Sequence, residues 1–149
     1  MRILLDANVL VRANEKSNGP ARRLLLDLIA RKHILITSAE ILIELARVLR
    51  YPRVQALFGL SEEQIYECVL FLKSVSVIVP TRAVTNRNFP IRDAWDAPIL
   101  QAAVTGEAEF ICTLDTDFYA AEIIAYCAVV GITILDDVSL IARLRSGQR

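Results

Sequence analysis

Short runs of apolar residues alternate along the chain with longer stretches in which apolar positions repeat at helical spacing. The short runs are rich in Ile or Val, which is typical of parallel strands covered on both faces. We expect strands at residues 3–5, 34–36, 75–79, 110–112 and 132–135, and helices at residues 21–31, 39–50, 62–72, 97–105 and 138–144. Strands that alternate with helices in this way indicate an α/β fold with a mainly parallel sheet.

Residues that favour the start of a helix stand close before most of the predicted helices. They are Pro20, Ser38, the capping box of Ser61 with Gln64, and Asp136 or Asp137. Tyr51, which precedes Pro52, is expected to end the second helix because a residue before proline avoids the α region. The start signals therefore agree with the helices that the apolar pattern predicts.

The composition narrows the class of protein. The chain has 149 residues, of which 54% are hydrophobic, and it contains no repeat or linker-like stretch, so we expect one domain over residues 1–149. Three widely separated cysteines without CxxC spacing argue against a disulfide framework or a thiolate zinc site. The longest stretch free of charge, residues 123–135, is shorter than the ~20 residues that span a bilayer. These features predict a soluble, cytoplasmic protein without a membrane segment.

Acidic side chains fall in four separate segments that the predicted fold brings toward one edge of the sheet. In parallel sheets, functional groups gather at the carboxyl ends of the strands. Asp6, with Asn8 two residues on, follows one predicted strand, and Asp115 and Asp117 follow another. Asp93 and Asp96 stand at the start of a predicted helix, and Glu44 lies within an apolar one.

Each of these acids, taken alone, also fits a structural role. An aspartate after a strand or before a helix commonly forms a turn or a helix cap. Glu44 either belongs to a solvated stripe with Glu40 and Arg47 or points into a polar site, and the helix alone does not decide between the two.

Taken together, the acids indicate a metal site. Carboxylates that lie a few ångströms apart repel one another, and a hard divalent cation is the simplest compensation. Oxygen ligands suit Mg²⁺ or Mn²⁺, and such a centre promotes phosphoryl chemistry.

The remaining charges favour a polyanionic substrate. The chain has 17 acidic and 17 basic residues, so setting aside six candidate acids leaves a formal excess of six positive charges. Fourteen of the basic residues are arginine, which suits bidentate contacts with phosphate. Arg47, Arg50 and Arg92 stand near the acidic segments and are candidates for binding nucleic acid, although solvated helix faces also explain single arginines.

Four motifs occur in an order that resembles a known family. They are Asp6-Ala7-Asn8 after the first strand, Glu44 within an apolar helix, Arg92-Asp93-Ala94-Trp95-Asp96 before a helix, and Thr113-Leu114-Asp115-Thr116-Asp117 after a strand. In this order the chain resembles the PIN-domain family of metal-dependent nucleases, in particular the toxin components of prokaryotic toxin–antitoxin systems (VapC-type and relatives).

The resemblance implies a three-layer fold, with a parallel five-stranded sheet between helices, and a site that binds Mg²⁺ or Mn²⁺. It assigns the catalytic carboxylates to Asp6, Glu44, Asp96 and Asp115, and the metal ligands to Asp6, Asp96 and Asp115 with Asp117 as a fifth candidate acid. It gives supporting roles to Asn8 and Thr113 and a secondary role to Asp93. Ala97 departs from the family pattern, which often has a second acid there.

The function that this resemblance implies is endoribonuclease activity of a toxin with a cognate antitoxin partner. A homodimer is a further expectation. Two alternatives remain open: a PIN-like module that binds RNA or protein without cutting, and a phosphatase with Asp6 as the nucleophile. Asn8, where such phosphatases carry a second acid, argues against the last of these.

Overall fold

Five parallel strands form the centre of the computed structural model, which describes residues 1–80 and 97–147. The strand order is β3-β2-β1-β4-β5, and every neighbouring pair is parallel. The strands are β1 (Arg2–Leu5), β2 (Ile34–Thr37), β3 (Ser76–Ile78), β4 (Phe110–Cys112) and β5 (Thr133–Leu135). The predicted parallel sheet of five strands is confirmed.

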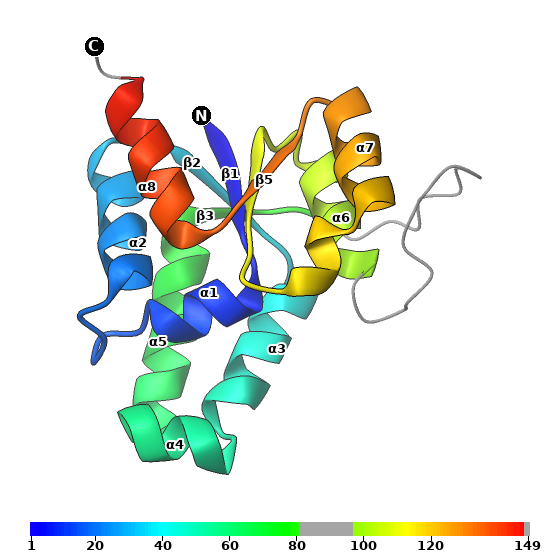
Figure 1. Ribbon diagram of the computed structural model, residues 1–149. Helices are drawn as coiled ribbons and strands as arrows, with labels where there is room; N and C mark the ends of the chain where they lie inside the picture. The colour runs from blue at the N-terminus through cyan, green and yellow to red at the C-terminus, as the bar shows by residue number, and fades with distance from the viewer. Residues whose placement is uncertain (81–96, 148–149) are drawn as a thin grey trace.

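Helices cover both faces of this sheet. Figure 1 shows α2 and α8 on one side of the strands and α6 and α7 on the other, which gives three layers. The helices are α1 (Ala7–Arg12), α2 (Pro20–Ala30), α3 (Ala39–Leu49), α4 (Pro52–Phe58), α5 (Glu62–Val75), α6 (Ala97–Thr105), α7 (Ala121–Val129) and α8 (Asp137–Ser146), with a 3₁₀ helix, η1 (Thr116–Tyr119). None of the described helices is long and apolar enough to cross a membrane.

The sequence pattern missed three helices and misplaced several boundaries by one to three residues. Helices α1, α4 and α7 were not expected. The predicted strand at 75–79 begins one residue later, because α5 continues its helical hydrogen bonding through Val75. Pro52 opens a helix of its own instead of only following one, since proline is well tolerated in the first turn.

Several local signals act as predicted. Ser61 and Gln64 form a complete capping box at the start of α5, and Ser38 caps α3. Of the two candidate caps for α8, Asp136 makes the capping bond, accepting from the backbone N–H of Ser139 at 2.7 Å. Asp137 is the first residue of α8, and its Oδ1 accepts from the backbone N–H of Val138.

The register of the sheet places the ends of β1 and β4 side by side. Leu5 pairs with Cys112, so the residues that follow them, Asp6 and Thr113, become neighbours. The backbone N–H of Asp6 donates to the carbonyl of Cys112 at 2.9 Å, which extends the ladder by one step. Both strands are deeply buried, so their carboxyl ends are a rigid support for polar side chains.

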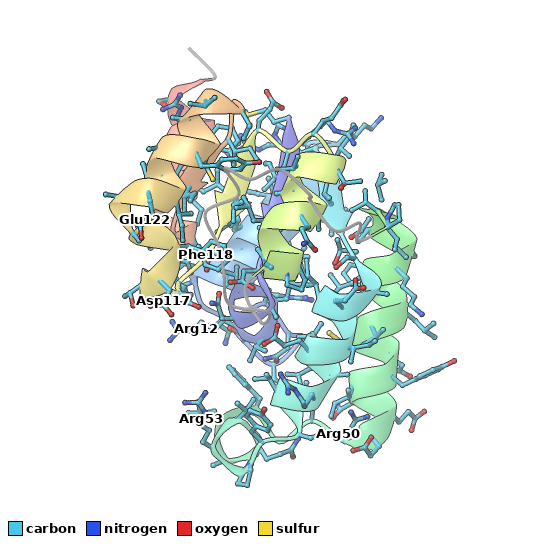
Figure 2. The ribbon with its side chains drawn as sticks, turned by 90° about the vertical axis from the view of Figure 1, so that its right-hand side faces the viewer. Arg12, Arg50, Arg53, Asp117, Phe118 and Glu122 are labelled. Atoms are coloured by element: carbon cyan, nitrogen blue, oxygen red, sulfur yellow. The ribbon has the colours of Figure 1, made fainter. Side chains whose placement is uncertain are left out.

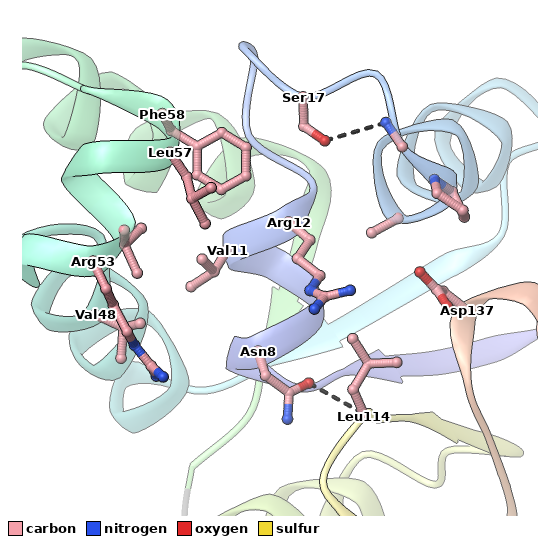
Figure 3. Close-up of a pocket in the computed structure, with 14 residues that line it drawn as sticks. Asn8, Val11, Arg12, Ser17, Val48, Arg53, Leu57, Phe58, Leu114 and Asp137 are labelled. Atoms are coloured by element: carbon pink, nitrogen blue, oxygen red, sulfur yellow. Dashed lines mark hydrogen bonds between the residues drawn. The ribbon is translucent and has the colours of Figure 1, made fainter.

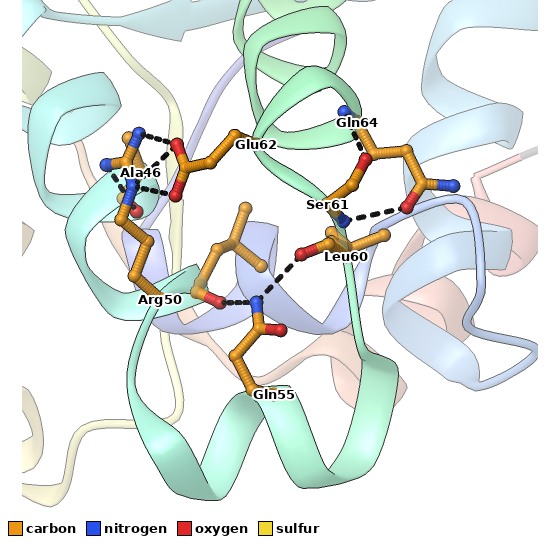
Figure 4. A network of polar contacts seen from close by, with 8 residues as sticks. Ala46, Arg50, Gln55, Leu60, Ser61, Glu62 and Gln64 are labelled. Carbon is orange, nitrogen blue, oxygen red and sulfur yellow. Dashed lines mark hydrogen bonds and ion pairs between the residues drawn. The ribbon is translucent and has the colours of Figure 1, made fainter.

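Polar contacts fix the projecting arm made by α3, α4 and the start of α5 (Figure 4). The guanidinium of Arg50 contacts both carboxylate oxygens of Glu62, the shortest distance being 2.8 Å. The side-chain amide of Gln55 donates to two carbonyl groups, one at the end of α3 and one before α5. These contacts hold α4 in place beside α1.

Candidate active site

Asp6 stands between β1 and α1 and is almost fully buried, with 6% of its surface exposed. Its backbone is still extended, and its Oδ1 accepts a hydrogen bond from the N–H of Ala7 at 2.7 Å. The carboxylate therefore caps α1, a helix that the sequence pattern did not predict. Capping uses only one of its two oxygens.

The other oxygen of Asp6 is held by two side chains. The hydroxyl of Thr113 donates to Oδ2 at 2.7 Å, and Nδ2 of Asn8 donates to the same atom at 3.2 Å. Asn8 in turn accepts at Oδ1 from the backbone N–H of Leu114 at 3.2 Å. The carboxylate is thus fixed in orientation by residues from both neighbouring strand ends, and Asn8 and Thr113 lie where supporting residues were expected.

Asp115 joins the same network through the backbone. Its N–H donates to the Thr113 hydroxyl at 3.1 Å, and its Oδ1 accepts from the N–H of Asp117 at 3.0 Å. This second bond starts the 3₁₀ helix η1. Asp115 is partly buried, whereas Asp117 is exposed on the outer side of η1 (Figure 2).

The electrostatics of the site centre on Asp6. Burial raises the pKa of Asp6 from its ordinary value of 3.8 to about 6. Hydrogen bonds from Thr113 and Ala7 lower that pKa, while the negative charges of Glu44 and Asp115 raise it further. A buried carboxylate that is also influenced by other negative charges favours a positive charge nearby.

Glu44 lies at the margin of the site on α3. Its side chain is 41% exposed, and its Oε1 lies 3.6 Å from Nη2 of Arg47 one turn later. Its charge nevertheless acts on Asp6. Both interpretations of this residue therefore hold in part, because Glu44 belongs to a solvated stripe that borders the acidic site.

A cavity of about 310 Å³ lies next to Glu44. It is lined by residues of α3 and of the first turn of α6, including Arg47, Pro98 and Ile99. Arg47 is thus beside the acids, while Arg50 is engaged by Glu62 at the far end of α3.

Three residues expected at the site lie outside the described residues. They are Arg92, Asp93 and Asp96. Within residues 1–80 and 97–147, no three His, Cys, Asp or Glu side chains come together closely enough to hold a metal ion.

A groove of about 520 Å³ opens from the other side of Asn8. Figure 3 shows Arg12 extending through its middle, with Leu57 and Phe58 on one wall and Asp137 on the opposite wall. Arg53 also lines the groove, from the start of α4. Asn8 lines this groove and also donates to the Asp6 carboxylate, so the groove borders the residues that hold Asp6.

The sequence interpretation did not single out Arg12 or Asp137. Arg12 comes four residues after Asn8, a spacing that places both on one face of a helix, but α1 was not predicted. Asp137 was considered only as a helix cap. The spatial arrangement of these residues depends on the packing of α1, α4 and α8.

The family model described as "PIN domain" matches residues 2–117 of the chain. The chain belongs to the PIN-domain family. No curated protein sequence matches this PIN-domain protein.

Two solved structures share the fold. VapBC2 from Rickettsia felis, solved bound to a DNA fragment from its promoter, superposes with a TM-score of 0.59 at 17% identity, over 91% of this PIN-domain protein and 98% of that chain. FitAcB from Neisseria gonorrhoeae superposes with a TM-score of 0.53 at 19% identity, over 91% of this PIN-domain protein and 97% of that chain. At these identities the likeness concerns the fold.

Proposed function

We propose that this protein is an endoribonuclease that depends on Mg²⁺ or Mn²⁺ and acts as the toxin of a toxin–antitoxin pair. The observation that carries the proposal is the Asp6 carboxylate, which is buried at a strand end, is held in orientation by Thr113 and Asn8, and is influenced by the negative charges of Glu44 and Asp115. Members of the PIN-domain family are generally nucleases, and they usually use divalent metals.

The donor chemistry of these residues fits a hard cation. Asp6 and Asp115 offer carboxylate oxygens, and each is fixed by hydrogen bonds that leave a lone pair free. We assign the ligand set to Asp6, Asp115 and Asp96, with Asp117 as an alternative partner on η1. When bound, Mg²⁺ or Mn²⁺ would polarise the scissile phosphate and lower the pKa of a coordinated water.

The chain's own groups supply orientation and proton transfer. Thr113 and Asn8 keep the Asp6 carboxylate in one orientation, which is the usual role of residues behind a metal ligand. We assign to Glu44, half exposed on α3, the role of accepting a proton from the attacking water. Arg47 beside Glu44 offers a cation to the phosphate backbone of the substrate. We expect direct hydrolysis without a covalent enzyme intermediate.

The toxin role rests on family membership and on the two structural neighbours. VapBC2 was solved with a DNA fragment from its promoter, and FitAcB shares the same fold. We infer that a cognate antitoxin binds this protein and blocks its acidic site. Co-expression with the product of the adjacent reading frame would test this inference by co-purification and by loss of cleavage.

The experiment that tests the nuclease is cleavage of labelled single-stranded RNA with Mn²⁺ present. We expect wild-type protein to cleave, EDTA to abolish cleavage, and Asp6→Asn and Asp115→Asn to lower the rate at least a hundredfold. Glu122→Gln is the matched control, because Glu122 is an exposed acid on α7 outside the site (Figure 2). Full activity in EDTA would contradict the proposal. Binding without cleavage would favour a non-catalytic module, and a phosphorylated Asp6 would favour a phosphatase.

A further inference from the structure

Asp137, the first residue of α8, is a buried carboxylate that uses only one of its oxygens within the described part of the chain. The residue is 6% exposed, and its Oδ1 accepts from the backbone N–H of Val138 at 2.9 Å. Oδ2 makes no hydrogen bond or ion pair with the residues that the structure describes. Since Asp136 already caps the helix, capping does not explain why a second acid is buried here.

The charged side chains that line the groove form no ion pair with one another within the described residues. The ion pairs among residues 1–80 and 97–147 are Arg31–Asp27, Arg47–Glu44 and Arg50–Glu62. Arg12, Arg53 and Asp137 belong to none of these pairs, although all three line the groove (Figure 3). The groove therefore presents two cations and one carboxylate to a ligand.

The walls of the groove differ in character. Val48, Leu57 and Phe58 make one side apolar, and Asp137 makes the opposite side an acceptor of hydrogen bonds (Figure 3). A volume of about 520 Å³ falls in the range of small-molecule sites, roughly 300–1,000 Å³. A flat ring with an apolar face and a polar edge, attached to a phosphate, would match the apolar wall, the Asp137 carboxylate and the two arginines of the groove.

We propose that this groove is a nucleobase subsite in which Asp137 reads guanine. The proposal rests on the proposed nuclease function and specifies which base of the RNA is bound beside the acids. Guanine presents two adjacent donors, N1–H and the N2 amino group, to the two oxygens of one carboxylate. Oδ2 of Asp137 is unused, and Oδ1 keeps a second lone pair beside the bond that it accepts from Val138. Adenine, cytosine and uracil each present a single donor group at the corresponding edge, so they form at most one such bond.

The same geometry places the rest of the nucleotide. Arg12 and Arg53 are positioned for the flanking phosphates, which they would bind without regard to base. Phe58 and Leu57 offer the apolar surface on which the base lies. Asn8 connects the groove to Asp6, so the bound guanine would be close to the scissile phosphate.

The test measures binding without cleavage. Heptamers of uridine with a single central guanine, adenine or cytosine, and the all-uridine heptamer, are titrated by fluorescence anisotropy into protein kept in EDTA. We expect wild type to bind the guanine heptamer about tenfold more tightly than the others, and Asp137→Asn to remove that preference. Asp136→Asn, which alters the neighbouring acid and keeps a residue able to cap α8, should retain it.

Arg12→Gln separates base reading from phosphate binding. We expect it to weaken all four heptamers by a similar factor and to leave the guanine preference intact. Equal binding of the four heptamers by wild type, or a guanine preference that survives in Asp137→Asn, would overturn the proposal.

Two further points keep the test decisive. If Asp137→Asn does not fold, guanosine monophosphate and uridine monophosphate are titrated into the wild-type protein instead. We expect the guanine nucleotide to shift the amide NMR signals of Val138 and Leu114 more than the uracil nucleotide does. Equal shifts would contradict the guanine subsite. Because no step requires metal or cleavage, a failed guanine preference leaves the nuclease proposal standing. Failure of the nuclease proposal would instead appear as cleavage that does not need metal, or as no cleavage at all.

Discussion

The hydroxyl of Thr113 donates a 2.7 Å hydrogen bond to Oδ2 of Asp6, across 107 positions of sequence. The bond joins the ends of two neighbouring parallel strands, and the same hydroxyl accepts from the N–H of Asp115. One threonine therefore sets the orientation of one acid and the backbone position of another. This arrangement makes Thr113 a positioning residue for the whole acidic site.

Replacing Thr113 with valine keeps the shape of the side chain and removes this bond. Because the bond lowers the pKa of Asp6, we expect that pKa to rise above its present value of about 6 in Thr113→Val. The acid limb of the pH–rate profile for RNA cleavage should move to higher pH, and the rate at pH 7 should fall about 10- to 100-fold. Thr113→Ser should restore the profile, whereas an unchanged profile in Thr113→Val would contradict the role of the hydroxyl.

Asp6 lowers the stability of the protein at neutral pH when no metal is bound. Its folded-state pKa of about 6 lies above the ordinary value of 3.8, so the folded state binds the proton more tightly than the unfolded state does. The favourable contribution is complete below pH 3.8 and is lost as the pH rises through about 6. An asparagine side chain at this position cannot ionise, so the Asp6→Asn variant escapes this loss.

Asparagine also loses an acceptor for the donors around Asp6, so the test compares the pH dependence of the two proteins. We expect the stability of Asp6→Asn relative to wild type to rise by on the order of 2 kcal/mol from pH 4 to pH 7.5 in EDTA, as measured by urea unfolding across that range. A variant whose stability relative to wild type does not change with pH would show that burial does not destabilise the ionised Asp6.

Gly106 allows the end of α6 to approach β2 closely. A Cβ atom at this position would lie 2.6 Å from Cγ2 and 2.8 Å from Cδ1 of Ile36, both in the core. We expect Gly106→Ala to lower the free energy of unfolding by about 1–3 kcal/mol through overpacking. Gly147→Ala is the control, because its nearest new contact is 3.7 Å away. Equal effects in thermal unfolding would contradict this explanation.

The strands, and the places of Asp6 and Asp115 at strand ends, were predictable because their determinants are local. Each strand is a short apolar run, and each of these two acids closely follows one. The capping box at Ser61 also identified the start of α5 correctly. Such signals require only neighbouring residues.

The missed helices lacked a local signal of that kind. Helix α1 has six residues and starts directly after Asp6, so its apolar residues resemble an extension of the strand. Helix α7 lies largely within the charge-free stretch, and its two faces differ little in hydrophobicity. The groove depends on α1 and α4 packing together, and its charged residues, Arg12 and Asp137, are brought together only by the tertiary fold.

The central claim is that Asp6 anchors a divalent cation among the acids, and direct metal binding tests it most closely. Isothermal titration of Mn²⁺ into metal-free wild type at pH 7.5 should show one site, and Asp6→Asn should weaken that site at least tenfold. Glu122→Gln should bind as wild type does. Equal Mn²⁺ affinity in wild type and Asp6→Asn would contradict the account.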